Sequence, residues 1–297
     1  MGNFTMKDSL AAVIVAFQPK PQQLMQLLDA LAESVGHVIV CDNGGAAWVA
    51  GVRRNVVYVS MGGNVGVGAA LNAGFRWAHR HGYAWVVTFD QDSAPQPGCL
   101  PRLTHVLRTE GETVAAVAPM IRDARSQRLG PLVGEITAWW RRPKLFLSDG
   151  VVAPLDHAIT SGMVVRLDAW RQVGPFREDF FIDYIDIEWC VRARARGYRI
   201  LGVGGAELLH ELGERWLFLP GGARVAVHRP ERVFYELRNG IWTHRLARDD
   251  WRWRLWHWWI GVKKGLFYLL FLPERRARLR AMMAAVRAVW RSAGDLR

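Results

Sequence analysis

The sequence has only three cysteines among its 297 residues, and it has no long apolar run. Cys41, Cys99 and Cys190 are far apart and form no Cys-x-x-Cys pair, which excludes a disulfide framework and a zinc ribbon and fits a reducing compartment. No uninterrupted apolar segment reaches about 18 residues, so we expect no membrane-spanning helix. The first ten residues lack an apolar core, and we expect no secretory signal.

Acidic residues are scarce at the C-terminal end of the chain. From Trp251 to Arg297, eleven Lys and Arg residues oppose two acids, and the same stretch holds six of the fifteen tryptophans. Beyond residue 274, apolar side chains recur at helical spacing beside arginines: Leu279, Met282, Met283, Val286 and Trp290. This pattern predicts that residues 246–297 form a basic amphipathic helical tail suited to an anionic membrane surface. Packing on the preceding domain and an oligomer interface are the alternatives, and nucleic acid is not expected because no recognition motif accompanies the charge.

Strands alternate with helices over the first hundred residues. Runs typical of buried strands lie at 10–17, 37–41, 56–59 and 85–89, with helical patterns at 21–35 and 66–81. This alternation predicts an α/β fold with a doubly wound, mostly parallel sheet covered by helices on both faces. Later in the chain we expect strands at 114–118 and 158–166, a loop at 122–132 and a helix within 180–197. Ligands of such sheets bind at the carboxyl ends of the strands.

The segment from Val87 to Ser93 has the most specific chemical pattern. An apolar run ends there in Asp90 and Asp92, one residue apart. In an extended segment, side chains at i and i+2 point the same way, so both carboxylates can converge on one hard cation that in turn holds a diphosphate. Asp-x-Asp is also common in ordinary turns, so this pattern alone leaves the metal site open.

A glycine-rich loop at residues 62–68 leads into the helix expected from residue 66. Glycine lets the backbone approach a ligand closely, and a helix N-terminus favours anions. The loop is neither a Walker loop nor a GxGxxG fingerprint, and a flexible turn explains it equally well. Ser161 and Gly162 leave a similar choice between a tight turn beside the site and a strand bulge.

A second group of acids, Asp183, Asp186 and Glu188, lies among aromatic and isoleucine side chains. Asp183 and Asp186 are three residues apart and would share one face of a helix. Such a setting suits a general base in a partly apolar site, although acids also complement the dipole at helix N-termini. His210 ends an apolar run and is either structural or the completion of a cation site begun by the aspartates.

Short motifs follow one another in a characteristic order. They are Ala16-Phe17-Gln18-Pro19, Asp42-Asn43, Asn64-Val65-Gly66, the Ala-rich helical segment at 69–74, Asp90-Gln91-Asp92-Ser93, the acids within 182–192, His210 to Gly213, and Arg238-Asn239. Together they resemble the family 2 inverting glycosyltransferases of GT-A fold, closest to the bacterial rhamnosyltransferases of O-antigen and surface polysaccharide synthesis. The resemblance covers residues 10–245. It departs at Gln18, where Asn is usual, and at Gly45, where Ser is usual, so it favours the reaction class over a particular nucleotide.

The resemblance implies a role for each motif. The residues implied to bind the donor are Phe17, Asp42, Asn64, Gly66, Asn72, Asp90, Ser161 and Gly162. A divalent cation, Mg²⁺ or Mn²⁺, would be bound by Asp90, Asp92 and His210 and would stabilise the leaving nucleoside diphosphate. Asp186 would be the catalytic base, supported by Asp183 and Glu188.

The implied organisation is a GT-A domain at residues 1–245, with a nucleotide-sugar half at about 10–95 and an acceptor half at 96–245, followed by the tail at 246–297. The expected enzyme transfers L-rhamnose from dTDP-L-rhamnose to a lipid-linked saccharide in the cytoplasm, peripherally bound to the inner face of the bacterial inner membrane. Alternatives are a GT-A transferase using UDP-galactofuranose or a UDP-hexose, a sugar nucleotidyltransferase, and a non-enzymatic membrane adaptor. Homo-oligomerisation stays open.

Overall fold

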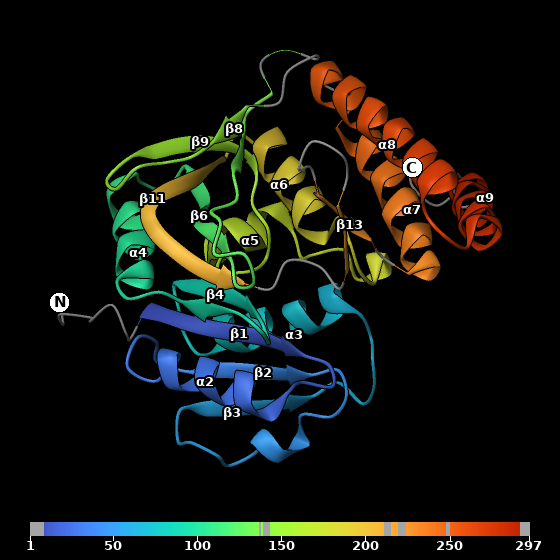
Figure 1. The fold of residues 1–297 in the computed structure, drawn as a ribbon. Coiled ribbons are helices and arrows are strands. Elements are labelled where there is room, and N and C mark those ends of the chain that lie inside the picture. The colour runs from blue at the N-terminus through green and yellow to red at the C-terminus, as the bar shows by residue number, and fades with distance from the viewer. Residues whose placement is uncertain are drawn as a thin grey trace. The chain divides into compact units, whose positions relative to one another are not determined.

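The computed structural model describes residues 9–136, 138, 143–210, 215–218, 224–227, 229–247 and 250–291. Within these ranges the chain forms two compact units (Figure 1). The sheet unit comprises the described residues up to 135 together with 143–181 and 185–210. The helical unit comprises the described residues of 136–142, 182–184 and 212–297.

A mixed β-sheet forms the centre of the sheet unit. Its strands are β1 (Leu10–Ala16), β2 (Val38–Asp42), β3 (Val56–Ser60), β4 (Trp85–Asp90), β5 (Ala94–Pro95), β6 (Val114–Asp123), β7 (Leu132–Gly134), β8 (Lys144–Leu145), β9 (Val152–His157), β10 (Val164–Arg166) and β11 (Arg199–His210). They lie in the order β3-β2-β1-β4-β10-β6-β11-β9-β7-β8, with β5 paired to β11. The first four strands run parallel, and antiparallel β10 joins β4 to β6.

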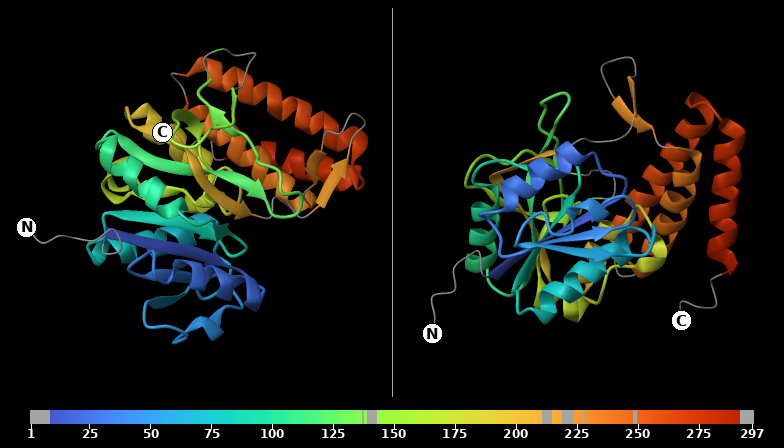
Figure 2. Two further views of the ribbon diagram at one scale, coloured as in Figure 1. Left: turned by 60° about the vertical axis from the view of Figure 1, so that its left-hand side comes forward. Right: turned by 90° about the horizontal axis from the view of Figure 1, so that it is seen from below.

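Helices cover both faces of the parallel half of the sheet, as the alternating pattern predicted. The helices of this unit are α2 (Pro21–Leu31), α3 (Val67–Arg80), α4 (Cys99–Thr109), α5 (Leu167–Val173) and α6 (Ile185–Ala195), with single turns η1 (Ala47–Val49) and η2 (Glu178–Phe180). The chain crosses from β1 to β2 in one direction along the sheet and from β3 to β4 in the other. Because such crossovers are right-handed, α2 and α3 lie on opposite faces (Figure 2). The doubly wound α/β architecture is confirmed.

The buried core of the sheet unit fixes the positions of the carboxyl ends of β1, β2 and β4. All of β2 and nearly all of β1 and β4 are buried, and each buried Val, Leu or Ile stabilises the fold by about 1.5–3 kcal/mol. Helix α3 packs directly on β1, because a Cβ at Gly74 would lie 2.5 Å from a methyl group of Val13. The register pairs Ala16 with Asp42 and Val15 with Asp90. Phe17, Asp42 and Asp90 therefore meet at one edge of the sheet.

Two strands differ from the sequence prediction. Of the strand expected at 158–166 only the last three residues form one, because β9 ends at His157 and β10 begins only at Val164. Between them Thr160 to Met163 form a tight turn, in which the N–H of Met163 donates to the carbonyl of Thr160 at 3.4 Å and Gly162 adopts φ +78°; the Gly162 N–H donates to the carbonyl of Thr88 on β4 at 2.7 Å. Strand β6 also continues to Asp123, into the segment that we expected to be a loop.

The helical unit contains β12 (Arg215–Phe218), β13 (Arg224–Val227), α7 (Pro230–Leu246), α8 (Trp251–Phe271) and α9 (Arg275–Arg291). Val233 of α7 packs with Tyr268 and Leu272 in a small core, against which Met282 of α9 also packs. Helix α7, expected in the catalytic domain, thus groups with the tail. None of the helices in the described part of the chain combines the length and the apolarity that crossing a membrane requires.

Candidate metal and catalytic site

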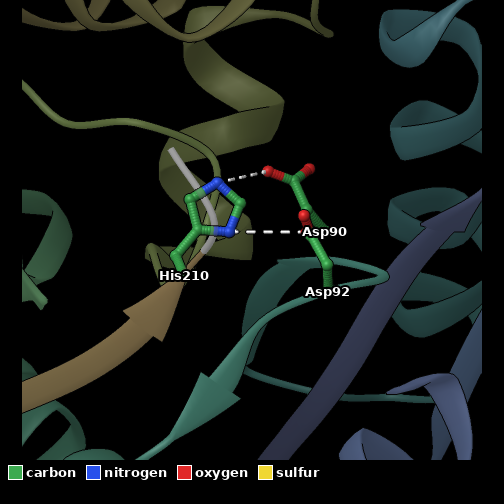
Figure 3. A group of neighbouring side chains, drawn as sticks. All are labelled: Asp90, Asp92 and His210. Carbon is green, nitrogen blue, oxygen red and sulfur yellow. Dashed lines mark ion pairs between the residues drawn. The ribbon is translucent and has the colours of Figure 1, made fainter. Parts of the chain in front are cut away.

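Asp90, Asp92 and His210 converge at one end of the sheet (Figure 3). His210 ends β11; its Nε2 lies 3.6 Å from Oδ2 of Asp90, and its Nδ1 lies 3.4 Å from Oδ1 of Asp92. One ligand atom from each residue lies within 4.8 Å of the others, a separation that a single divalent cation could close. The Asp90 side chain is 41% exposed and that of Asp92 is 28% exposed, so a bound ion would remain accessible to donor oxygens.

The two aspartates converge for a reason other than the one we expected. The chain is not extended here: Gln91 and Asp92 form a turn, and the N–H of Ser93 bonds to the carbonyl of Asp90 at 3.1 Å. After the turn, β5 runs antiparallel to β11 and pairs Ala94 with Leu209. That pairing brings His210 beside the aspartates, a long-range contact that local sequence spacing does not contain.

Residues Thr160 and Ser161 connect the metal-site candidates to the predicted base. The Ser161 hydroxyl donates a short hydrogen bond to Oδ2 of Asp90, and the N–H of Thr160 donates to Oδ2 of Asp186 at 3.1 Å. Ser161 is only 1% exposed, so it orients Asp90 from behind. Gly162 forms the turn that follows, where a Cβ would lie 2.8 Å from Pro119. Two neighbouring residues thus hold both carboxylates.

The three acids of the second group take separate roles in the structure. Asp183 does not share a helix face with Asp186, because α6 begins only at Ile185 and Asp183 has φ +65°. Within the helical unit, Asp183 accepts two hydrogen bonds of 2.8 Å from Arg232.

Glu188 is fully buried and accepts hydrogen bonds from Arg192 at 2.5 and 2.8 Å. Burial raises the pKa of Glu188, and the Arg192 guanidinium opposes this. Its carboxylate is therefore engaged in holding α6, and among the three acids Asp186 is the one tied to the metal-site candidates.

The environment of Asp186 suits a proton acceptor. Its Oδ1 accepts from the N–H of Ile187 at 2.8 Å, and its Oδ2 accepts from Thr160. Burial raises the pKa of Asp186 above its usual range, while the charge of His157 and these backbone N–H groups oppose the rise. A carboxylate whose pKa is raised accepts a proton more readily, which general base catalysis requires.

Phe17 and Asp42 lie at the strand edge expected for the nucleoside. Phe17 is 45% exposed, and its backbone is held on both sides by Gln91, whose side chain accepts from the Phe17 N–H at 2.8 Å and donates to its carbonyl at 3.1 Å. Asp42 is mostly buried and accepts hydrogen bonds from the N–H groups of Gly44 and Ala46 and from the Tyr58 hydroxyl. Its carboxylate shapes the loop below Phe17.

Gln91 is a site residue for which no separate role was predicted from the sequence. Its position between Asp90 and Asp92 is the sequence signal that could have indicated a role. In the structure its side chain bonds to the backbone of Phe17 and not to the candidate metal ligands.

The glycine-rich loop is built by close backbone approach. Asn64 is exposed, and its side chain accepts from the N–H of Gly66 at 3.2 Å. Gly66 has φ +88°, and a Cβ there would lie 2.7 Å from the backbone of Phe181, so this position requires glycine. Asn72 is fully buried; its side chain accepts from the Phe176 N–H and donates to the Phe176 carbonyl. None of the Asn72 side chain is exposed, so its predicted part in the donor site would be to hold the backbone at Phe176 and not to contact the donor.

A family model described as "Glycosyl transferase family 2" matches residues 12–172, more than half of the chain. The matched stretch includes Asp90, Asp92 and Ser161, whereas Asp186 and His210 lie beyond it.

The chain is similar to two curated rhamnosyltransferases. It is 28% identical over 242 residues to dTDP-rhamnosyl transferase RfbF of Shigella flexneri, covering 80% of each chain. It is 26% identical over 288 residues to N-acetylglucosaminyl-diphospho-decaprenol L-rhamnosyltransferase of Mycobacterium tuberculosis, covering 84% of this chain and 90% of that protein.

Solved structures show the same fold at low sequence identity. GalNAc-T7 with UDP, GalNAc and Mn²⁺ superposes with a TM-score of 0.60 at 10% identity, covering 97% of this chain and 57% of that one. Residues 1–349 of S. aureus TarS in complex with UDP-GlcNAc superpose with a TM-score of 0.58 at 12% identity, covering 95% of this chain and 81% of that one. These neighbours confirm the expected GT-A-like fold.

Proposed function

Because the chain belongs to glycosyl transferase family 2, we propose that it is an inverting rhamnosyltransferase that moves L-rhamnose from dTDP-L-rhamnose to a lipid-linked saccharide. The observation that carries this proposal is the connection, through Thr160 and Ser161, between the partly buried Asp186 and the group of Asp90, Asp92 and His210. The choice of sugar is supported by the likeness to RfbF and to the mycobacterial L-rhamnosyltransferase. The name of the latter supports a polyprenyl-diphosphate-linked acceptor.

One group of residues would act on the leaving diphosphate, and Asp186 would act on the acceptor hydroxyl. Asp90, Asp92 and His210 would hold Mg²⁺ or Mn²⁺, which when bound would neutralise charge on the leaving diphosphate. Phe17 would offer its exposed ring to the base of the nucleotide. Asp186 would take the proton of the acceptor hydroxyl as that oxygen bonds to the anomeric carbon and the bond to the donor phosphate breaks. Attack from the face opposite the leaving group inverts the anomeric configuration.

A donor screen tests this function directly. We expect dTDP-L-rhamnose to raise the melting temperature of the protein in Mn²⁺, and to do so more than UDP-galactofuranose or a UDP-hexose at the same concentration, because a ligand that binds only the folded state stabilises it. EDTA should remove most of the shift. The measurement is a thermal-shift titration, with dTDP alone as the control for nucleotide recognition. Stabilisation by a UDP-sugar but not by dTDP-L-rhamnose would contradict the donor assignment and leave the family unchanged.

The helical unit supplies a surface that fits the proposed lipid acceptor. The apolar stripe expected on α9 is solvent-exposed at Leu279, Met283, Val286 and Trp290, whereas Met282 packs inward. Helix α8 exposes a second apolar face, formed by Trp251, Leu255, Trp258, Trp259, Leu266 and Leu270. Between residues 251 and 291, ten Lys and Arg residues oppose a single acid. We propose that this surface binds an anionic membrane peripherally.

Removing basic charge from α9 should weaken membrane binding. Each Lys or Arg near an anionic surface contributes about 1 kcal/mol, so replacing exposed Arg276 and Arg280 with Gln should lower the partition coefficient on anionic liposomes by roughly 30-fold. The matched control replaces exposed Arg80 and Arg196, in the sheet unit, with Gln and should change liposome binding little. Liposome sedimentation measures both. Equal loss in the two variants would mean that only net charge matters, and it would refute a docking surface on the helical unit.

A further inference from the structure

The side chain of Gln91 continues the hydrogen bonding of the sheet beyond the end of β4. Strand β4 ends at Asp90, and the pairing of Asp90 with Val15 is the last one between β1 and β4. Phe17 lies two residues beyond Val15, where β4 has already given way to the turn at Gln91 and Asp92. The N–H of Phe17 donates to Oε1 of Gln91 at 2.8 Å, and its carbonyl accepts from Nε2 of Gln91 at 3.1 Å.

A glutamine side chain suits this position because it ends in the same groups as a peptide bond. Its amide offers a carbonyl acceptor and an N–H donor together, whereas a carboxylate offers acceptors only. The Gln91 amide thus does for Phe17 what a further residue of β4 would have done. Both hydrogen bonds are solvent-exposed, so each contributes little to the stability of the fold. Their consequence is geometric, because two bonds to one planar amide fix the orientation of the Phe17 backbone.

The chain on either side of Phe17 is held from the opposite direction, by the loop that follows β2. The Ala16 carbonyl accepts from the N–H of Asn43 at 2.7 Å, and the Gln18 N–H donates to the carbonyl of Gly44 at 2.6 Å. The Phe17 ring lies against this loop, since a Cβ at Gly44 would be 3.5 Å from two of the ring carbons. The side chain is still 45% exposed. An exposed aromatic ring therefore stands on a backbone that is fixed from both sides.

We propose that Gln91 is a positioning residue for Phe17 and fixes the ring on which the nucleobase of the donor stacks. This inference rests on the proposed role of Phe17 in nucleotide binding. Because Gln91 lies between Asp90 and Asp92, a single turn would place both the cation ligands and the ring. The base and the diphosphate of one nucleotide would then meet their two binding elements at a spacing that this turn sets. Arranging the ring in advance lowers the ordering cost of binding, so the expected effect is on donor affinity.

The test removes the amide of Gln91 without adding charge. Gln91→Met keeps a side chain of similar length but makes neither hydrogen bond to Phe17. We expect Phe17→Ala to raise the dissociation constant of dTDP about tenfold, as is usual when base stacking is lost, and Gln91→Met to raise it about fivefold, because the ring remains but is less ordered. At saturating donor kcat should stay within about twofold, so that only KM changes. Isothermal titration and steady-state kinetics measure these values.

Two controls separate this role from damage to the metal site or to the fold. In Gln91→Met the ratio of dTDP affinities with Mn²⁺ and with EDTA should stay within about twofold of the wild-type ratio, because Asp90 and Asp92 are unchanged. A ratio that falls toward one would place the effect at the metal ligands and overturn the inference. Gln96→Ala removes an amide that donates to the carbonyl of Ala94, and it should leave dTDP affinity unchanged. Both variants should melt within about 3 °C of the wild type.

The double variant gives the decisive result. Adding Gln91→Met to Phe17→Ala should weaken dTDP binding by less than about twofold more, because the ring that Gln91 positions is already gone. Additive losses, or unchanged dTDP affinity in a folded Gln91→Met protein, overturn the inference, and Gln91→Ala decides the matter in the same way if the methionine variant does not fold. If Phe17→Ala loses affinity while Gln91→Met does not, only this inference fails. If Phe17→Ala binds dTDP as the wild type does, the proposed role of Phe17 fails first.

Discussion

Replacing Asp186 with asparagine is expected to lower kcat by about a thousandfold while leaving the donor dissociation constant within about twofold, because general base catalysis contributes 10²–10⁴-fold to rate. Asparagine keeps the shape of the side chain and an oxygen that can accept from Thr160, but it cannot take the acceptor proton. The enzyme should therefore bind the donor normally and transfer it very slowly. Single-turnover kinetics with dTDP-L-rhamnose measure the rate, and isothermal titration measures the affinity.

Asp179→Asn is the matched control for that substitution. Asp179 is an acid in η2 whose side chain is 47% exposed and accepts from Arg177, so its loss should change kcat by less than about threefold, as is usual for surface substitutions. A rate for Asp186→Asn within tenfold of the wild type would show that another group takes the proton. Equal losses in both variants would point to general damage around α6.

The second large effect concerns the metal group. Asp90→Ala or Asp92→Ala should weaken donor binding in Mn²⁺ by about a hundredfold, because the cation is expected to contribute several kcal/mol of charge stabilisation to the diphosphate. The wild type in EDTA should bind the donor as weakly as the variants do, and EDTA should have no further effect on the variants. Isothermal titration of dTDP-L-rhamnose with and without Mn²⁺ measures all of these affinities.

Two outcomes would contradict a metal role for Asp90 and Asp92. Donor affinity in the variants that equals the wild-type value, with or without Mn²⁺, would exclude a metal role for these carboxylates. A loss of affinity that EDTA does not reproduce in the wild type would indicate that the aspartates contact the donor directly. His210→Ala should give a smaller loss in Mn²⁺ than either aspartate variant, since imidazole contributes no negative charge to the site.

The sequence predicted the sheet because its signal is local. The apolar runs and the helix between Pro21 and Leu31 follow from side-chain periodicity, and the alternation of strands and helices leaves few topologies for β1 to β4. The convergence of Asp90 and Asp92 could also be predicted, because the two residues are close in the sequence. A turn, however, and not an extended strand brings their carboxylates together.

The contacts that complete the site depend on distant segments. Ser161 reaches Asp90 because β10 enters the sheet antiparallel beside β4, and His210 reaches the aspartates because β5 doubles back on β11. Neither pairing leaves a periodic trace in the sequence. The separate environments of Asp183 and Asp186 were hidden for a different reason: a short segment of positive φ precedes α6 and ends the helical spacing that we assumed.

A structure of the protein with Mn²⁺ and dTDP, measured at a wavelength where manganese scatters anomalously, tests the central claim most directly. We expect one anomalous peak within bonding distance of Asp90, Asp92 and His210, with diphosphate oxygens on its exposed side. A diphosphate bound elsewhere on the protein, or bound at this edge of the sheet with no manganese between it and the two aspartates, would contradict the account.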